Sequence, residues 1–291
     1  MTLLRWCREL HWPHLGLLAG LPVWWWWATT HALSPTMTLL VWLSITAAVL
    51  ALSERWRPFR RDWRPSSAQL RRDGTVFAMN ALADGGATAL LAMFAVVLSR
   101  GDSGWPLWLQ IGAGLLVSEL ASYWTHRLSH RSNGWWRVHL LHHRPAQVNV
   151  ANAVLAHPLN AIYDKLVRVA PLLLLGLDDA ALIAVALFAL TQSLAVHANV
   201  AGHLGPLDYI IGSAGLHRLH HSTRADEAGN FGTALPIWDQ VFGTYRRGAS
   251  PAEVGVFDPR PYPDELQLRA LLLWPFACKR CARSVRCCAL H

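Results

Sequence analysis

The stretch ELASYWTHRLSHRSNGWWRVHLLHH, residues 119–143, carries a dense set of histidines at the end of a long apolar run. Its histidines follow the patterns H-x3-H and H-x2-H-H, and the second pattern recurs near residue 220. Residues at i, i+3 and i+4 share one face of an α-helix, so each pattern directs several imidazoles to the same side. The patterns therefore predict helices that present histidines to a common site. The eight histidines are His126, His130, His139, His142, His143, His217, His220 and His221.

A metal site explains these histidines better than a proton relay or a pH sensor, because imidazole is a common metal ligand. Eight imidazoles exceed the coordination sphere of one ion, so we expect two metal ions that share them and keep open positions. Imidazole binds iron, zinc, copper and nickel alike, and the ligand type does not select among them. The sequence contains no H-E-x-x-H, no Gly-rich phosphate loop and no G-x-S-x-G. These absences disfavour a zinc protease, a nucleotide-dependent enzyme and a serine hydrolase.

The composition of the whole chain is typical of an integral membrane protein. Hydrophobic residues make up 53% of the chain and charged residues 15%, against about 25% charged in an average soluble domain. The net charge is +8, and the basic residues stand in short blocks beside apolar runs. Such blocks indicate loops that contact anionic lipid and set the orientation, and no nucleic-acid partner is expected.

Four apolar runs are long enough to cross a bilayer and predict transmembrane helices. They cover residues 14–33, 36–52, 75–98 and 105–125. A further apolar stretch, residues 154–196, is interrupted by charged residues and a Gly-Leu-Asp-Asp turn, and it predicts a re-entrant helical hairpin. The expected fold is an all-α integral membrane protein with about four transmembrane helices, this hairpin and a cytoplasmic His-rich helical cap.

Seven arginines lie between residues 55 and 72, in the loop after the second apolar run. By the positive-inside rule this loop is cytoplasmic. Both termini and the histidine clusters are then expected on the cytoplasmic side of the membrane, which would be the inner membrane in a bacterium. We expect a single membrane domain, residues 1–291, with an N-terminal transmembrane hairpin and Arg-rich loop (1–72), a histidine-bearing region (75–245) and a basic tail (246–291) that contains four of the five cysteines.

Glu119 lies two helical turns before His126 and on the same helical face. A carboxylate inside a membrane span is costly and is seldom without a function. Histidines that bind a metal usually donate their second ring N–H to an acceptor, often a carboxylate. We therefore predict that Glu119 orients one of the ligating histidines.

Several separate motifs, in the same order, resemble those of the fatty acid hydroxylase / sterol desaturase superfamily. The matching segments are residues 119–130, 136–143, 216–222, 230–232 and 238–245. Asn149 and the pair His157-Pro158 stand where the family usually has Asn and His-Pro, and His197 stands where it often has a further histidine. The resemblance thus adds His197 and His157 to the candidate metal ligands.

The resemblance implies a non-haem di-iron centre that uses O2 as cosubstrate to hydroxylate or desaturate a membrane-embedded lipid, such as an acyl chain or a sterol. It would make residues 75–245 the catalytic domain. Zinc can replace the two iron ions in purified protein, because zinc binds nitrogen donors more tightly than ferrous iron does. The sequence shows no flavin, haem or ferredoxin motif, so an external electron donor of the reductase, ferredoxin or cytochrome type is expected. Two alternatives from other classes stay open: a dizinc hydrolase that acts on a membrane substrate, and a metal transporter or sensor with a histidine relay.

Overall fold

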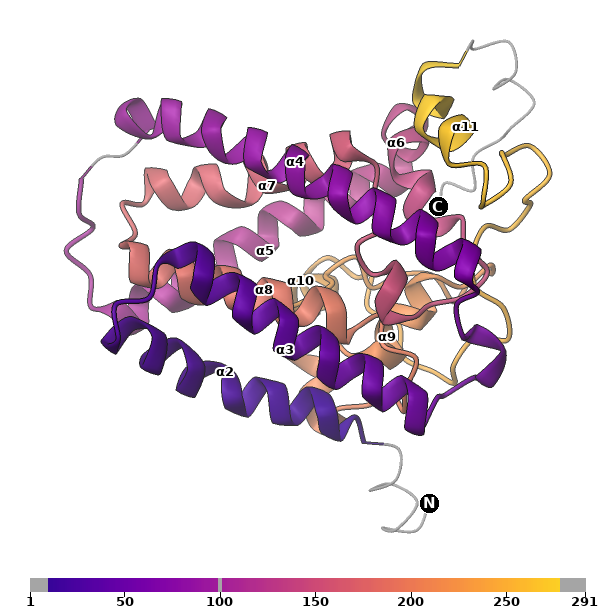
Figure 1. Ribbon diagram of the computed structural model, residues 1–291, viewed down its shortest axis with the longest axis horizontal. Coiled ribbons are helices and arrows are strands. Elements are labelled where there is room, and N and C mark those ends of the chain that lie inside the picture. The colour runs from indigo at the N-terminus through magenta and orange to yellow at the C-terminus, as the bar shows by residue number, and fades with distance from the viewer. Residues whose placement is uncertain (1–9, 99–100, 278–291) are drawn as a thin grey trace.

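The computed structural model describes residues 10–98 and 101–277 (Figure 1). Within these ranges the chain is helical, and the only β-type pairings are two isolated bridges. The α-helices are α2 (Trp12–Thr30), α3 (Pro35–Trp56), α4 (Ser67–Leu98), α5 (Leu107–Arg131), α6 (Asn133–His143), α7 (Pro158–Leu174), α8 (Asp179–Ala195), α9 (Ala214–His220), α10 (Ile237–Val241) and α11 (Leu268–Leu273). The 3-10 helices are η1 (Arg61–Trp63), η2 (Val150–Asn152), η3 (Gly205–Tyr209) and η4 (Trp274–Phe276). The four cysteines predicted to form part of a basic tail lie outside the described residues.

The long helices form a bundle in which segments far apart in the sequence lie side by side (Figure 1). Helix α7 packs against α4 and α5, and α8 packs against α2, α3 and α5. Residues 154–196, predicted to form a re-entrant hairpin, contain α7 and α8, and each of these two helices packs mainly against the other long helices. The shorter α6 and α9 lie at the end of the bundle where α5 and α8 stop.

Local sequence explains where several of these helices begin. Pro35 and Pro158 occupy the first turns of α3 and α7, where the missing N–H of proline removes no hydrogen bond. Ser34 Oγ accepts a hydrogen bond from the N–H of Met37 at 3.3 Å. His157 Nδ1 accepts one from the N–H of Leu159 at 3.1 Å and so caps α7.

Two of the predicted membrane spans meet the length and hydropathy that a bilayer crossing requires: α3 and the part of α4 from Ser67 to Ala95. Only 22% and 17% of these two spans are buried inside the protein, so most of their apolar surface faces outward. Large apolar surface without a protein partner is stable in lipid and costly in water. The exposed apolar side chains of the two helices include Met37, Leu40, Ile45, Leu52, Phe77, Leu82, Leu90, Met93, Phe94 and Val97.

A half-buried carboxylate connects α3 to the loops around the histidines. Glu54 Oε1 accepts hydrogen bonds from the N–H of Val150 at 2.8 Å and from the N–H of Asn199 at 2.7 Å. Residue 150 begins η2, and residue 199 lies two residues after His197. The outer helix α3 thereby fixes two loops that come from distant parts of the sequence.

Candidate metal centre

Two groups of histidines lie at the end of the bundle where α5 and α8 stop. Within each group, one ring nitrogen of every member lies within 4.8 Å of those of all the others. The five-histidine group consists of His126, His130, His139, His143 and His220. The four-histidine group consists of His142, His197, His217 and His221. All eight histidines of the sequence patterns, together with His197, are thus brought together.

Four elements supply these side chains. His126 and His130 stand one turn apart near the end of α5, and His197 follows the end of α8. Helix α6 supplies His139, His142 and His143, and α9 with its C-terminal cap supplies His217, His220 and His221. Each group takes members from at least three of these elements, so neither group forms until the helices pack.

Hydrogen bonds at Nδ1 set the orientation of five of the nine rings. Because each acceptor is a carbonyl oxygen, the ring nitrogen must be the donor, and the neutral ring keeps its lone pair on Nε2. The Nδ1 acceptors are the Phe231 oxygen for His126 at 2.8 Å, Asn160 Oδ1 for His139 at 2.9 Å, the Leu155 oxygen for His142 at 3.3 Å, the Ser193 oxygen for His197 at 2.7 Å and the Gly229 oxygen for His220 at 2.7 Å.

In the five-histidine group, three Nε2 atoms have no hydrogen-bond partner within the described part of the chain. His126, His130 and His139 each have a buried Nε2 with no hydrogen-bond partner among the described residues. In the other group, Nε2 of His142 and Nε2 of His197 lie 3.3 Å apart, and both rings already donate from Nδ1. Two lone pairs therefore face each other across this contact, which is unfavourable unless a cation lies between them.

Burial keeps the rings in the form that binds metal. It lowers the pKa of His139 and of His197 to about 4, and that of His220 to about 3. These imidazoles are then neutral at pH 7 and cannot relieve the contacts by taking up protons. A set of neutral, convergent Nε2 lone pairs fits two metal ions, one for each group.

A buried aspartate shapes the loop that orients His126. Asp239 accepts hydrogen bonds from the N–H of Phe231 at 2.8 Å and from the N–H of Gly232 at 2.8 Å. A Cβ on Gly232 would lie 2.7 Å from Asp239 Oδ2, so glycine is required for this approach. The closing motif of the sequence, residues 230–245, thus places the Phe231 carbonyl against the His126 ring.

Two sequence predictions turn out differently in the structure. Glu119 is buried, but it contacts no histidine: its Oε1 accepts from Arg168 Nη1 at 2.5 Å. A carboxylate binds a guanidinium more strongly than it binds a neutral imidazole. The half-buried Arg168 therefore takes the position expected for a histidine ring. His157 lies outside both groups, since its Nδ1 caps α7 and its Nε2 lies 3.0 Å from the oxygen of Leu272.

Asn160, which the sequence reasoning missed, provides the single side-chain acceptor among the five oxygens described above. The signal was present, because Asn160 is an amide in the first turn of the apolar helix α7, two residues after Pro158. The four backbone acceptors carry no such signal, because any residue has a carbonyl group.

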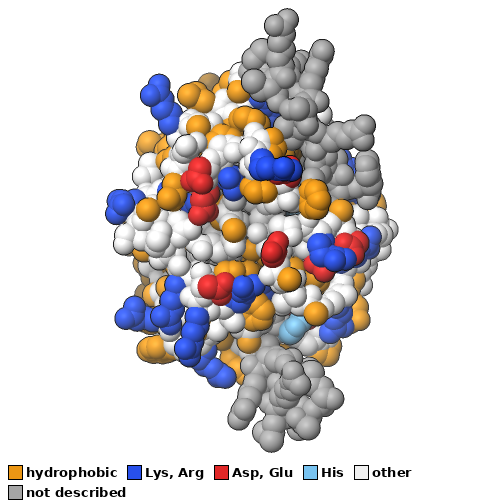
Figure 2. All heavy atoms as spheres, turned by 90° about the vertical axis from the view of Figure 1, so that its right-hand side faces the viewer, with side chains coloured by type: hydrophobic (Ala, Val, Ile, Leu, Met, Phe, Trp, Pro, Cys, Tyr) orange, Lys and Arg blue, Asp and Glu red, His pale blue; other side chains and the backbone are white. Residues whose placement is uncertain are grey.

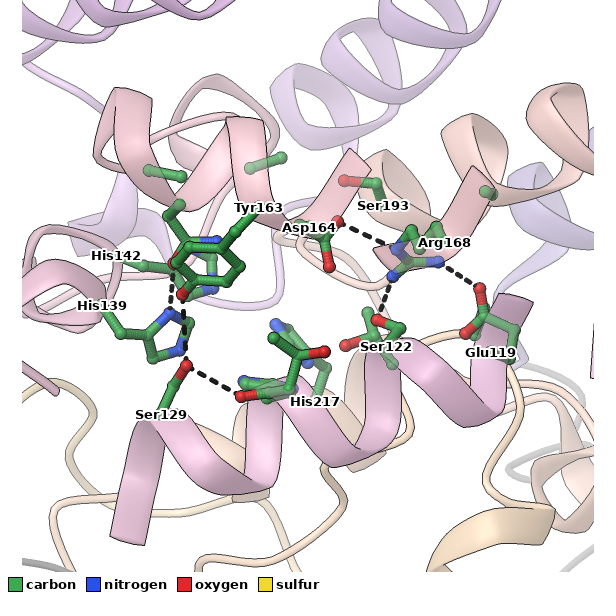
Figure 3. A pocket seen from close by; sticks show the side chains of 18 of the residues that line it. Glu119, Ser122, Ser129, His139, His142, Tyr163, Asp164, Arg168, Ser193 and His217 are labelled. Carbon is green, nitrogen blue, oxygen red and sulfur yellow. Dashed lines mark hydrogen bonds and ion pairs between the residues drawn. The ribbon is translucent and has the colours of Figure 1, made fainter. Parts of the chain in front are cut away.

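A pocket of about 140 Å³ reaches the histidines between α5, α7 and α8 (Figure 3). His126, His139, His142, His197 and His217 line one end of it. Glu119, Ser122, Asp164 and Arg168 line the other end, and Ser129 and Tyr163 stand near His139. The hydroxyl groups of Tyr163 and Ser129 are hydrogen-bonded at 3.2 Å.

The outer surface at this end of the bundle is charged. Figure 2 shows basic and acidic side chains scattered over the face, with histidine reaching the surface at one small place. Little histidine is therefore exposed on the described part of this face, and five of the histidines line the pocket between α5, α7 and α8.

Comparisons with known proteins point to one family. Residues 111–244 match the model of the fatty acid hydroxylase family. Ornithine lipid hydroxylase of Rhizobium tropici is 30% identical over 240 residues, which are 75% of this chain and 71% of that protein. Alkylglycerol monooxygenase of Homo sapiens is 31% identical over 160 residues, 54% of this chain and 34% of that protein. Delta(7)-sterol 5(6)-desaturase of Leptosphaeria maculans is 26% identical over 148 residues, 51% of this chain and 40% of that protein. No solved structure matches the chain.

Proposed function

Because the chain belongs to the fatty acid hydroxylase family, we propose that it is an O2-dependent membrane oxidoreductase that hydroxylates a lipid at a non-haem di-iron centre. The observation that supports this most directly is the convergence of nine histidines in two groups, with Nε2 atoms on His126, His130 and His139 that are unpartnered among the described residues. Relatives named as a hydroxylase and a monooxygenase favour hydroxylation over the hydrolase and transporter alternatives.

Different residues would bind the metal ions, orient the ligating rings and hold the lipid. The five-histidine and four-histidine groups would each hold one iron ion, while the carbonyl acceptors on Nδ1 keep the rings in the metal-binding tautomer. When bound, the di-iron centre supplies the activation of O2 for attack on an unactivated C–H bond. The pocket orients the lipid with one carbon toward the histidines and keeps water away from the reaction.

Hydroxylation converts a C–H bond and O2 into C–OH and water, and it consumes two electrons and two protons. The sequence has no flavin, haem or ferredoxin motif, so an external donor of the reductase, ferredoxin or cytochrome type supplies the electrons. The substrate is a membrane lipid, as the relatives named for ornithine lipid, alkylglycerol and sterol suggest. The Arg-rich loop between α3 and α4 supports, by the positive-inside rule, a cytoplasmic position for the histidine groups and both termini.

The test removes one ligand from each group. His142→Ala and His220→Ala should each abolish product formation and lower the bound metal from two ions per chain, because each loses one Nε2 ligand. Membrane insertion should be unchanged, since the apolar helices are untouched. The matched control is His31→Ala, an exposed histidine at the end of α2.

The measurement is elemental analysis together with mass spectrometry of lipids, per inserted protein, with O2 and reductant in excess. Near-normal turnover in both ligand variants would refute the di-metal oxygenase. Zinc in the overexpressed protein would be compatible with it, because zinc binds nitrogen donors more tightly than ferrous iron does.

A further inference from the structure

The end of the pocket away from the histidines carries three charged side chains that the proposed metal ligation does not use. Arg168 donates from Nε to Asp164 Oδ2 at 2.9 Å and from Nη1 to Glu119 Oε1 at 2.5 Å. Its Nη2 donates to the hydroxyl of Ser122. Two carboxylates and one guanidinium leave this group with a formal charge of −1.

One carboxylate oxygen of the group has no donor. Glu119 is 2% exposed, and its Oε2 is buried with no hydrogen-bond partner among the described residues. A buried carboxylate oxygen without a donor raises the free energy of the folded protein, because its hydrogen bonds to water are lost and no other hydrogen bond replaces them. Glu119 lines the pocket, so a group that enters the pocket can supply the missing donor.

Asp164 is more open than Glu119. Its side chain is 36% exposed, and one oxygen accepts from Arg168 while the other points into the pocket (Figure 3). Two carboxylates therefore present acceptor oxygens at the same end of the pocket. An entering group with several N–H donors would be suited to both.

No second arginine or lysine among the residues that line the pocket balances this charge. Among the residues that line the pocket, Arg168 is the one arginine or lysine. The neighbouring Lys165 is held by Asp84 at 2.7 Å, and neither of these residues lines the pocket. Charges placed inside a bundle of apolar helices mark functional sites, because their burial is costly unless a partner arrives.

We propose that Glu119 and Asp164 form a subsite for an ammonium group of the substrate, so that the lipid is an amine-bearing one. An ammonium brings the missing positive charge and up to three N–H donors for the two carboxylates. Arg168 positions both carboxylates, and Ser122 fixes the guanidinium. The inference rests on the proposed function for the identity of the ligand as substrate.

The length of α5 sets where such a lipid would be oxidised. Glu119 and His126 are two turns apart, which is about 10 Å along the helix axis. The small side chains of Ala153, Ala156, Ala189 and Ala234 also line the pocket and leave room for a carbon chain. The carbon that reacts would lie roughly 10 Å from the ammonium nitrogen.

Binding of two small probes to the purified full-length protein tests the subsite without turnover. The probes are octylammonium and 1-octanol, which share an alkyl chain and differ in charge, and the titration is followed by tryptophan fluorescence without reductant. Octylammonium should bind at least tenfold more tightly than 1-octanol. Asp164→Asn should weaken octylammonium binding about 10- to 100-fold, the range for a charge-assisted hydrogen bond, and leave 1-octanol unchanged.

Two further variants make the result specific. Glu119→Gln should act in the same direction as Asp164→Asn, and both amides keep an oxygen for Arg168, so the fold should persist. Asp84→Asn is the matched control: it removes a carboxylate that is ion-paired to α7 outside the pocket, and it should leave the preference for octylammonium intact.

Equal binding of the two probes would overturn the subsite. So would a loss of affinity for both probes in Asp164→Asn, because that result would mean that the carboxylates only balance the charge of the metal centre. Oxidation of a neutral lipid without any ammonium preference would keep the proposed function and remove the subsite. Ammonium-selective binding by a protein that oxidises no lipid would keep the subsite and remove the proposed function.

Discussion

Asn160 holds His139 through a side-chain amide, at 2.9 Å from Nδ1, whereas His126, His142, His197 and His220 are held by backbone carbonyls. A backbone acceptor persists through any substitution that keeps the fold. The side chain of Asn160 can be removed by substitution. Such a variant tests the orientation of the His139 ring without changing His139 itself.

We predict that Asn160→Ala weakens metal binding about 10- to 100-fold, as loss of a partner of a ligating histidine usually does. The released ring of His139 can adopt the tautomer that carries a proton on Nε2, and this tautomer cannot bind the metal through Nε2. Competition with a chelator of graded strength measures the change in affinity. Asn160→Asp keeps an acceptor and should retain the metal.

Equal metal retention in Asn160→Ala and the unmodified protein would show that packing alone orients His139. Thermal unfolding of the metal-free forms separates the two roles, because a ligand-orienting residue changes the metal affinity more than it changes the stability without metal.

The turn between α7 and α8 depends on a backbone that only glycine adopts readily. Gly176 has a φ of +66°, and a Cβ there would overlap the carbonyl oxygen of Gly101. The Ser103 N–H also donates to the Gly176 carbonyl at 3.0 Å, which ties this turn to the segment before α5. The positions of α5, α7 and α8, which enclose the pocket, are linked at this point.

We predict that Gly176→Ala destabilises the protein by about 1–3 kcal/mol from backbone strain alone, with a further penalty from the clash. Thermal unfolding in detergent measures the change. Gly85→Ala is the matched control, because Gly85 lies inside α4 and a Cβ added there would have no atom within 4 Å. That change should be neutral or stabilising by up to about 1 kcal/mol. An unchanged unfolding temperature in Gly176→Ala would contradict the role of the turn.

The loops between the long helices can be assigned to one side of the membrane or the other, and this assignment can be tested. Ser34 and Asp102 lie in the loops after α2 and before α5, and both are exposed. Ser66 lies in the Arg-rich loop, and Ala249 follows α10 at the opposite end of the bundle. Single cysteines at the first two positions should react with an impermeant maleimide from the side opposite to cysteines at the last two. The native cysteines are replaced by serine for this experiment, and labelling of Ser66→Cys from outside the cell would reverse the proposed topology.

The histidine groups also link metal binding to the stability of the whole molecule. Nine imidazoles from α5, α6, α9 and the end of α8 converge, and in the metal-free protein the lone pairs of His142 and His197 face each other. A metal that binds only the folded state stabilises it by about 4 kcal/mol at a free concentration a thousandfold above its Kd.

We predict that removal of the metal by a chelator lowers the unfolding temperature and that added ferrous iron or zinc restores it. The double variant His142→Ala, His220→Ala serves as the control, since it loses a ligand in each group and should show a much smaller shift with metal. An unfolding temperature that is the same with and without metal would mean that the histidines do not bind it in the folded protein.

The helical class and the histidine patterns could be predicted from the sequence, because hydrophobic runs and the i, i+3, i+4 spacing are local properties. Of the four predicted spans, two lie in helices that are long and apolar enough to cross a membrane, α3 and α4. The motifs also predicted His197 beside the eight patterned histidines, and the structure places it in the four-histidine group. Family membership followed from the order of these motifs, which the comparisons confirmed.

The division of the histidines between two groups emerged only from the packing of the helices. The neighbours His142 and His143 join different groups, and so do His220 and His221. Consecutive helical residues point about 100° apart, so a sequence pattern shows which helix carries the ligands but does not show which site each one faces. Helix packing also determines the partner of Glu119. Arg168 lies on α7, which packs beside α5, and no local spacing in the sequence connects the two residues.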